Sequence, residues 1–152
     1  MKSPDSLSSN IIYVCGEFAH GFHQMLTREF KESDIVVTVE QFSVLATLFY
    51  QDGLSQQEIS DALGRDKTTI ARVISIMERD NMITRVTNKK DNRGKLIYLT
   101  RKGRSLQQKA VAVSGKLYLK AIGNLKESEL KAAIKVMASM TSNLSNTEKF
   151  KW

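Results

Sequence analysis

Basic and hydroxyl side chains are concentrated in the middle of this 152-residue chain, and they are the strongest candidates for a binding site. The first group lies in a segment with helical periodicity and consists of Lys67, Thr68, Thr69 and Arg72. The second group follows in a polar, turn-rich segment and consists of Lys89, Lys90, Asp91, Arg93 and Lys95. Arginine can bind a guanine edge with two hydrogen bonds, threonine can contact a base or a phosphate, and lysine neutralises phosphate charge. These residue types indicate binding to a polyanion.

The charge of the chain is unevenly distributed along its length. Residues 65–104 contain twelve Lys/Arg and only four Asp/Glu, whereas residues 1–64 contain three Lys/Arg and nine Asp/Glu. A field this uneven indicates that one part of the molecule meets a polyanion. Together with the pattern of elements described below, it predicts duplex DNA as the partner.

The bulk composition indicates one globular domain with a core of its own. Hydrophobic residues make up 41% and charged residues 26%, both ordinary values. The single cysteine, Cys15, rules out an intramolecular disulfide and a zinc finger, and it suits a reducing cytosol. No apolar run approaches the ~20 residues that a membrane span requires. Residues 1–10 lack the apolar centre of a secretory signal, so we expect a cytoplasmic protein.

Two helices are expected before the basic region. The first should span about residues 9–31, because one apolar stripe recurs there at spacings of three and four. Its members are Ile11, Cys15, Phe18, Phe22, Met25 and Leu26. The second helix should begin at Thr38, since Thr38 and Gln41 have the capping-box spacing. Its expected inner face consists of Phe42, Leu45, Leu48 and Phe49.

A helix-turn-helix is predicted next. Ser55 and Glu58 form a second capping box, and Gly64 should end the short helix that follows. The expected buried face of this helix is Ile59, Ala62 and Leu63. Asp66 should cap a further helix running to about residue 80, with Ile70, Val73, Ile74 and Met77 inside. Two helices joined by a glycine-containing turn are typical of DNA-binding proteins, and the second would present its outward residues to the major groove.

A basic β-hairpin and two further helices complete the expected order of elements. Residues 83–87 and 96–100 have strand character, and the intervening loop carries the second basic group. A thin basic loop can enter the minor groove, where an arginine senses narrow A·T tracts. Thr100 should cap a long helix with inner residues Leu106, Ala110, Val113 and Leu117. After a break at residues 123–124, a last helix has a heptad-like seam of Leu130, Ile134, Met137, Thr141 and Leu144.

These motifs resemble a known family. Residues 54–63 are similar to the first helix-turn-helix helix of MarR-type transcriptional regulators, and residues 66–74 are similar to their recognition helix. The strongest match is the wing, with Asp91-x-Arg93 followed by Leu99-Thr100-x-x-Gly103. The resemblance covers nearly the whole chain and implies that Asp91 pairs with Arg93, which reaches DNA. Asn81 stands where the family usually has glycine, and asparagine tolerates the same left-handed backbone.

The expected fold is therefore mostly α with a small β-hairpin wing, in one domain over residues 1–152. Residues 38–100 would form the winged helix-turn-helix part, and residues 9–31 and 101–146 the helical dimerisation part. The resemblance implies a homodimer, and the apolar seams of the terminal helices give an independent reason for one. The alternative is a monomer whose terminal helices fold back on its own core.

Three kinds of sensor follow from the resemblance, because MarR-type proteins respond to a small aromatic acid, an oxidant or a metal. Cys15 lies one residue from the reactive cysteine of the hydroperoxide-sensing branch, but it shares a stripe with Phe18 and Phe22, so we expect a buried, inert thiol. Glu17, His20 and His23 drift about 120° around a helix, so no metal site is expected from them. The expected effector site is an apolar pocket between the first, second and fifth helices, open to an aromatic or phenolic molecule.

The sequence thus predicts a sequence-specific duplex-DNA-binding transcriptional regulator, a ligand-responsive repressor that binds a pseudo-palindromic operator as a homodimer without a cofactor. One alternative is a redox-sensing regulator of the organic-hydroperoxide type that uses Cys15. Another is a winged-helix protein-interaction module that does not bind DNA. An enzyme is not expected, since the chain has two histidines, one cysteine and no nucleophile-elbow or phosphate-loop motif.

Overall fold

The structure, a computed structural model, describes residues 10–88 and 94–145. The described part contains six helices and a small three-stranded sheet, which confirms the predicted fold class. The elements in chain order are α1 (Ile11–Glu32), α2 (Val39–Tyr50), β1 (Leu54–Ser55), α3 (Gln56–Leu63), α4 (Lys67–Arg79), β2 (Ile83–Thr87), β3 (Lys95–Leu99), α5 (Arg101–Ile122) and α6 (Glu127–Ser145).

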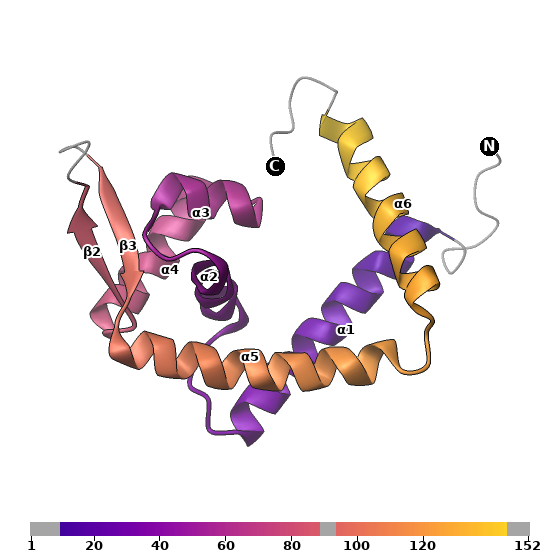
Figure 1. The fold of residues 1–152 in the computed structure, drawn as a ribbon, viewed down its shortest axis with the longest axis horizontal. Helices are drawn as coiled ribbons and strands as arrows, with labels where there is room; N and C mark the ends of the chain where they lie inside the picture. The colour runs from indigo at the N-terminus through magenta and orange to yellow at the C-terminus, as the bar shows by residue number, and fades with distance from the viewer. Residues whose placement is uncertain (1–9, 89–93, 146–152) are drawn as a thin grey trace.

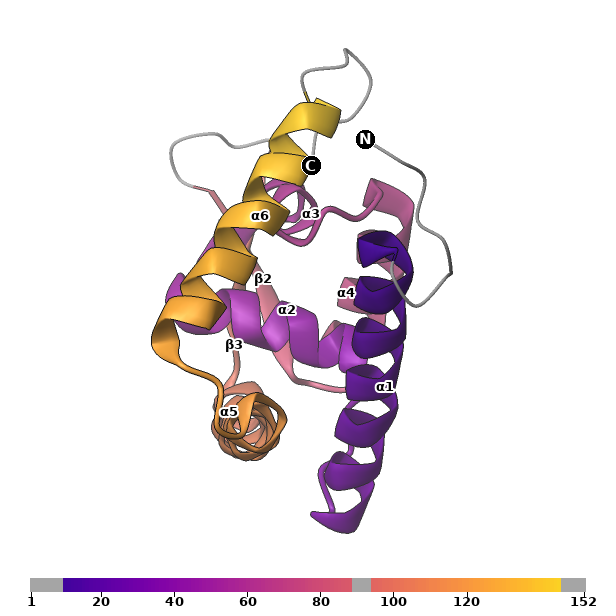
Figure 2. The same cartoon turned by 90° about the vertical axis from the view of Figure 1, so that its right-hand side faces the viewer.

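Helix α5 connects the two halves of the molecule. In Figure 1 it runs along the lower edge, with α2, α3, α4 and the hairpin above its N-terminal half. Helix α1 crosses its other half, and α6 rises from its C-terminal end beside the beginning of α1. Figure 2 looks along α5 and shows α1 and α6 on the same side of the molecule as its C-terminal end. We call α2, α3, α4 and the sheet the reading part. The reading part and the terminal helices are thus both attached to α5.

The core of the reading part is built from α2, α3, α4 and the sheet. All four predicted inner residues of α4 are buried, as are Leu45, Leu48 and Ile59. Phe49 was predicted to face inward, and this is wrong: it is 53% exposed and packs edge-on against Tyr50. The buried face of α2 instead consists of Gln41, Val44, Leu45 and Leu48, which is rotated by one position from the predicted stripe. On α3, Ala62 is exposed and Ser60 is buried, which also differs from the prediction.

The sheet has the order β1-β3-β2, with antiparallel pairing throughout. Strand β1 was not predicted, because two residues are too few to show a period, and its Leu54 pairs with Ile97. Lys95 was predicted in the loop and instead begins β3, opposite Thr87. The other members of the predicted wing group, Lys89, Lys90, Asp91 and Arg93, lie outside the described residues.

A second core joins α1 to α2 and α5 around Leu26, Phe30, Ile35, Ala110 and Leu117. The beginning of α1 and all of α6 stay outside this core, because most of their apolar side chains are exposed. One contact between them is the 3.4 Å approach of Cys15 Sγ to Met137 Sδ. In the part of the chain that the structure describes, no helix combines the length and the apolar character of a membrane span.

Candidate nucleic-acid interface

Reciprocal caps define where α3 begins and ends. The Ser55 hydroxyl accepts from the Glu58 N–H at 3.2 Å, and the Glu58 carboxylate accepts from the Ser55 N–H at 2.7 Å. This bond to the backbone of Ser55 lowers the pKa of Glu58 below its ordinary value. Gly64 ends the helix with φ of 57°, a left-handed conformation that costs glycine no steric strain. The predicted capping box and stop are both confirmed.

The cap of α4 uses one of the predicted reading residues. Asp66 accepts from the Thr69 N–H at 2.8 Å and from the Thr69 hydroxyl at 2.6 Å. The bond from the hydroxyl is the main reason why the pKa of Asp66 lies below its ordinary value. Thr69 is half-buried, and its hydroxyl hydrogen is directed to its own helix. A local partner of this kind competes with a base for the same donor.

The outer face of α4 is polar and exposed, as predicted. Lys67, Thr68, Arg72 and Ser75 are exposed on it. The Gln56 amide of α3 donates to the Lys67 carbonyl at 3.3 Å and ties the two helices together near this face. The helix N-terminus, with its partial positive charge, lies at the same end as Lys67 and Thr68. This arrangement can bind phosphate at the helix end and read bases along the helix.

Arg85 of β2 is a further basic residue near this face, and sequence reasoning did not single it out. Its guanidinium forms an ion pair with Glu78 at 3.3 Å and donates to the Ser75 hydroxyl at 3.4 Å. It therefore links the hairpin to the last turns of α4. Arg85 and Lys95 also line a shallow groove of about 310 Å³ beside the beginning of α3. The alternation of β2 gives no signal for this role, since it depends on how the strand packs on α4.

The hairpin is joined to α4 through a left-handed residue. Asn81 has φ of 58°, which confirms the backbone that its position after the helix predicted. The Met82 N–H then donates to the Met77 carbonyl at 2.8 Å, which closes the end of α4. Strand β2 begins one residue later. The hairpin is therefore anchored directly to the end of the candidate reading helix.

The candidate sensor residues lie at the beginning of α1. Cys15 was predicted to be buried and is instead half-buried, with its Sγ 3.4 Å from Met137 Sδ of α6. Tyr13 donates to Glu17 at 3.0 Å, and this bond raises the pKa of Tyr13 above its ordinary value. His20 shares a 2.8 Å hydrogen bond with Gln24. Within residues 10–88 and 94–145, no three His, Cys, Asp or Glu side chains gather in a way that could hold a metal ion.

An aromatic groove of about 370 Å³ lies where the effector pocket was predicted, between α1, α2 and α5. Its lining consists of Phe22, Phe42, Ala46, Phe49, Tyr50, Val111, Ser114, Gly115 and Tyr118. Phe49 and Tyr50 meet edge to face, with ring centres 5.4 Å apart. The groove therefore joins the last turns of α2 to the middle of α5. A flat aromatic molecule would fit this shape and chemistry.

The amino-acid sequence is similar to those of known transcriptional regulators. The chain is 30% identical over 106 residues to the HTH-type transcriptional regulator TtmR of Methylorubrum extorquens (strain PA1), covering 70% of this chain and 53% of that protein. It is 29% identical over 92 residues to the organic hydroperoxide resistance transcriptional regulator of Bacillus subtilis (strain 168), covering 59% of this chain and 63% of that protein. The chain thus spans between about half and two thirds of the length of these two curated relatives.

The chain has the same fold as a solved structure over almost the full length of both chains. The chain in the crystal structure of the S. aureus MepR–DNA complex matches with a TM-score of 0.81 and 26% identity, covering 91% of this chain and 99% of that one. The model of the MarR family matches residues 37–95, which contain α2, the helix-turn-helix, β2 and the beginning of β3. With this match, the two capped helices and the sheet order in place, the chain belongs to the MarR family of winged helix-turn-helix transcriptional regulators.

Proposed function

We propose that the protein binds duplex DNA in a sequence-specific manner and regulates transcription in the cytoplasm as a homodimer. The observation that carries this proposal is the exposed polar face of α4, which carries Lys67, Thr68 and Arg72 and whose last turns are tied to the hairpin through Arg85. The excess of basic residues in this region supports it, because phosphate neutralisation supplies much of the affinity for DNA. The fold shared with a DNA-bound relative supports the same docking geometry.

The homodimer is supported by the apolar surface that the terminal helices leave uncovered. The exposed apolar residues of α1 and α6 are Ile11, Ile12, Tyr13, Val14, Phe18, Ile134, Val136 and Leu144. An exposed apolar area on two adjacent helices is typical of an interaction surface. A two-fold dimer would bury the same surface of both copies and place two α4 helices about 34 Å apart, one turn of DNA.

The test is the affinity for duplex DNA as a function of salt concentration, with Arg93→Ala and Arg28→Ala as matched charge removals. We propose that Arg93 contacts the minor groove and that Asp91 orients it, although both lie outside the described residues. Arg93→Ala should weaken binding and reduce the salt slope by about one. Arg28 pairs with Glu32 on α1, outside the winged helix-turn-helix part, so its removal should change neither. A parent protein without salt-dependent affinity would be a protein-interaction module instead.

We further propose that an effector in the aromatic groove releases the DNA, which would make the protein a repressor. Among the residues that the structure describes, no Lys, Arg or His lines this groove, so a carboxylate there would meet no charged partner from them. An uncharged phenol or another neutral aromatic molecule fits better than an aromatic acid. The titration of an operator complex with a phenol and with the matching benzoate tests this. The phenol should weaken DNA binding by about 5–150-fold, the usual range of allosteric coupling, and the benzoate should have no such effect.

A second candidate function is oxidant sensing through Cys15. Its thiol is only half-buried and lies 3.4 Å from Met137, so oxidation would disturb the contact between α1 and α6. We still expect an inert thiol, and Cys15→Ser should therefore keep both DNA binding and its control. An operator titration with and without organic hydroperoxide separates the two possibilities. Release of DNA by the oxidised parent, but not by the Cys15→Ser variant, would establish the sensing role.

A further inference from the structure

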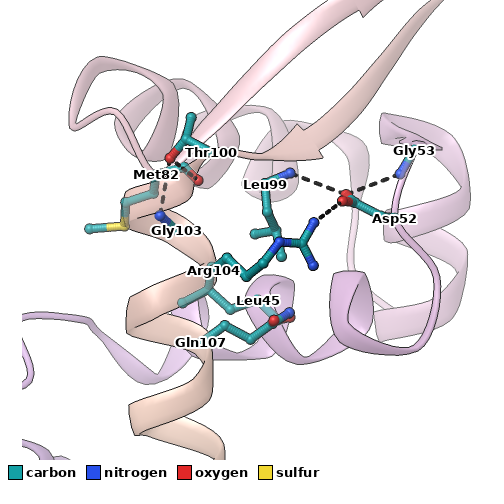
Figure 3. Close-up of polar contacts among 9 residues, drawn as sticks. All are labelled: Leu45, Asp52, Gly53, Met82, Leu99, Thr100, Gly103, Arg104 and Gln107. Atoms are coloured by element: carbon teal, nitrogen blue, oxygen red, sulfur yellow. Dashed lines mark hydrogen bonds and ion pairs between the residues drawn. The ribbon is translucent and has the colours of Figure 1, made fainter.

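The connection between α2 and β1 contains Asp52, whose carboxylate forms bonds to groups in three parts of the fold. Asp52 Oδ1 accepts from the Leu99 N–H at the end of β3 at 3.1 Å and from the adjacent Gly53 N–H at 3.2 Å. Its other oxygen, Oδ2, accepts from Arg104 Nη2 in the first turn of α5 at 2.8 Å. Figure 3 shows these three bonds converging on the carboxylate. Asp52 therefore connects the end of α2, the sheet and α5 in one place.

Further contacts attach the beginning of α5 to the reading part. The Thr100 hydroxyl donates to the Asn81 carbonyl at 2.6 Å and lies 3.1 Å from the Met82 carbonyl. The Gln107 side chain is 1% exposed and donates to the Leu45 carbonyl at 2.6 Å. Residues 100–107 are thus tied at one side to the start of β2 and at the other to α2. Asp52 and Arg104 supply the charged contact between these two attachments.

The position of this pair indicates that its role is orientation. The Asp52 and Arg104 side chains are 27% and 53% exposed, and such a pair contributes little to stability because water screens it. Its geometry is nevertheless specific, since the carboxylate is held by two backbone N–H groups before it meets Arg104. A rotation of the sheet against α5 would change the distance between the Asp52 carboxylate, which is bonded to the end of β3, and Arg104 on α5. This pair is therefore suited to fix an angle.

We propose that Asp52 is a positioning residue that sets the angle between the winged reading part and α5 through Arg104, and thereby the spacing of the two α4 helices in the dimer. This inference rests on the proposed function, because spacing matters only if two copies bind one DNA. Helix α5 transmits the angle, since it continues from Arg104 to the contacts with α1. A change in the angle between the reading part and the beginning of α5 would displace α4 relative to α4 of the partner copy.

The substitution Asp52→Asn separates the contact with Arg104 from the bonds that Asp52 forms with the Leu99 and Gly53 N–H groups. An asparagine oxygen can still accept from the Leu99 and Gly53 N–H groups, whereas its amide nitrogen is a donor and cannot bind the guanidinium of Arg104. Arg104→Gln removes the same contact from the other side. Arg101→Gln is the matched control, because Arg101 is an exposed arginine of the same helical turn and no contact of its side chain is seen among the described residues.

The first measurement needs no DNA. Spin labels are placed on cysteines at Thr84 of β2 and Lys116 of α5, both exposed, in a Cys15→Ser background. Labelled chains are mixed with an excess of unlabelled chains, so that only distances within one chain are recorded. Asp52→Asn and Arg104→Gln should broaden the distance distribution, and Arg101→Gln should leave it unchanged. Equal widths in all four proteins, with unchanged melting temperatures, would overturn the proposal.

The second measurement uses a selected operator and two versions in which the half-site spacing is one base pair longer or shorter. The parent and Arg101→Gln should prefer the selected spacing by at least about fivefold, the lower end of typical coupling. Asp52→Asn and Arg104→Gln should lose most of this preference while binding a single half-site as the parent does. A preference that survives in both variants would refute the link to spacing. If the parent binds no duplex at all, the proposed function fails, and the label distances alone decide whether Asp52 positions the wing.

Discussion

Gly103 gives the sharpest test of how the reading part is joined to α5. A Cβ atom at this position would lie 1.8 Å from the Met82 carbonyl oxygen and 2.8 Å from its carbonyl carbon. Non-bonded contacts need roughly 3.5 Å, so α5 would have to move away by well over an ångström. The same carbonyl accepts from the Thr100 N–H at 3.1 Å, a bond that this movement would break. Figure 3 shows Met82, Thr100 and Gly103 in contact at this junction.

The expected cost of Gly103→Ala follows from these contacts. Overpacking costs about 1–3 kcal/mol, and a lost hydrogen bond leaves a buried carbonyl that costs about 1–3 kcal/mol more. A total of about 2–6 kcal/mol should lower the melting temperature by roughly 4–24 °C in a chain of this length. The control is Gly115→Ala in the same helix, where an added Cβ meets no atom within 4 Å. Thermal unfolding of both variants at equal protein concentration decides the matter, and a Gly103→Ala protein as stable as the parent would refute the argument.

Three further perturbations test other residues of the reading part and of α5. Gln107→Ala should destabilise the protein by about 1–3 kcal/mol in urea unfolding, because it removes a buried hydrogen bond to the Leu45 carbonyl and the packed side chain that makes it. Folding lowers the pKa of Glu58, so the stabilising effect of its carboxylate should be complete above about pH 5 and lost as the pH falls through the folded pKa. Glu58→Gln should therefore reduce the pH dependence of the melting temperature in this acid range. Arg72→Ala should relax base preference at one position of each half-site by about 1–3 kcal/mol in a comparison of single-base operator variants, and an equal loss on every sequence would make Arg72 a phosphate contact.

The local elements could be predicted because their signals are local. The capping boxes at Thr38 and Ser55, the glycine stop at residue 64 and the apolar face of α4 all lie within a few residues of the element they define. Each cap satisfies backbone N–H groups that would otherwise lack a partner, so its residue types are restricted. The aromatic groove could be placed for a related reason, since the helices that line it were identified from their periodicity.

The contacts that join the elements could not be predicted in the same way. Arg85 lies ten residues from its partner Ser75, and Arg104 lies 52 residues from its partner Asp52. No period or spacing relates such residues before the fold is known. Thr69 was expected to face DNA because it is outward on the helical wheel, but the wheel does not show that Asp66 captures its hydroxyl. A local polar partner therefore changes which residues are free to read a base.

The place where the reading part ends also depends on these distant contacts. The sequence places the boundary at residue 100, because Thr100 caps a new helix. The contacts of Asp52 with Arg104 and of Leu45 with Gln107 continue for two more turns, so these turns belong mechanically to the reading part. A rotation of that part must therefore carry the beginning of α5 with it and be absorbed farther along the helix. The aromatic groove touches α5 at Val111, Ser114 and Gly115, just beyond the last of these contacts. A ligand there would contact α5 where the polar contacts with the reading part end and the packing against α1 begins, and for this reason we expect effector binding to change the spacing of the two α4 helices on DNA.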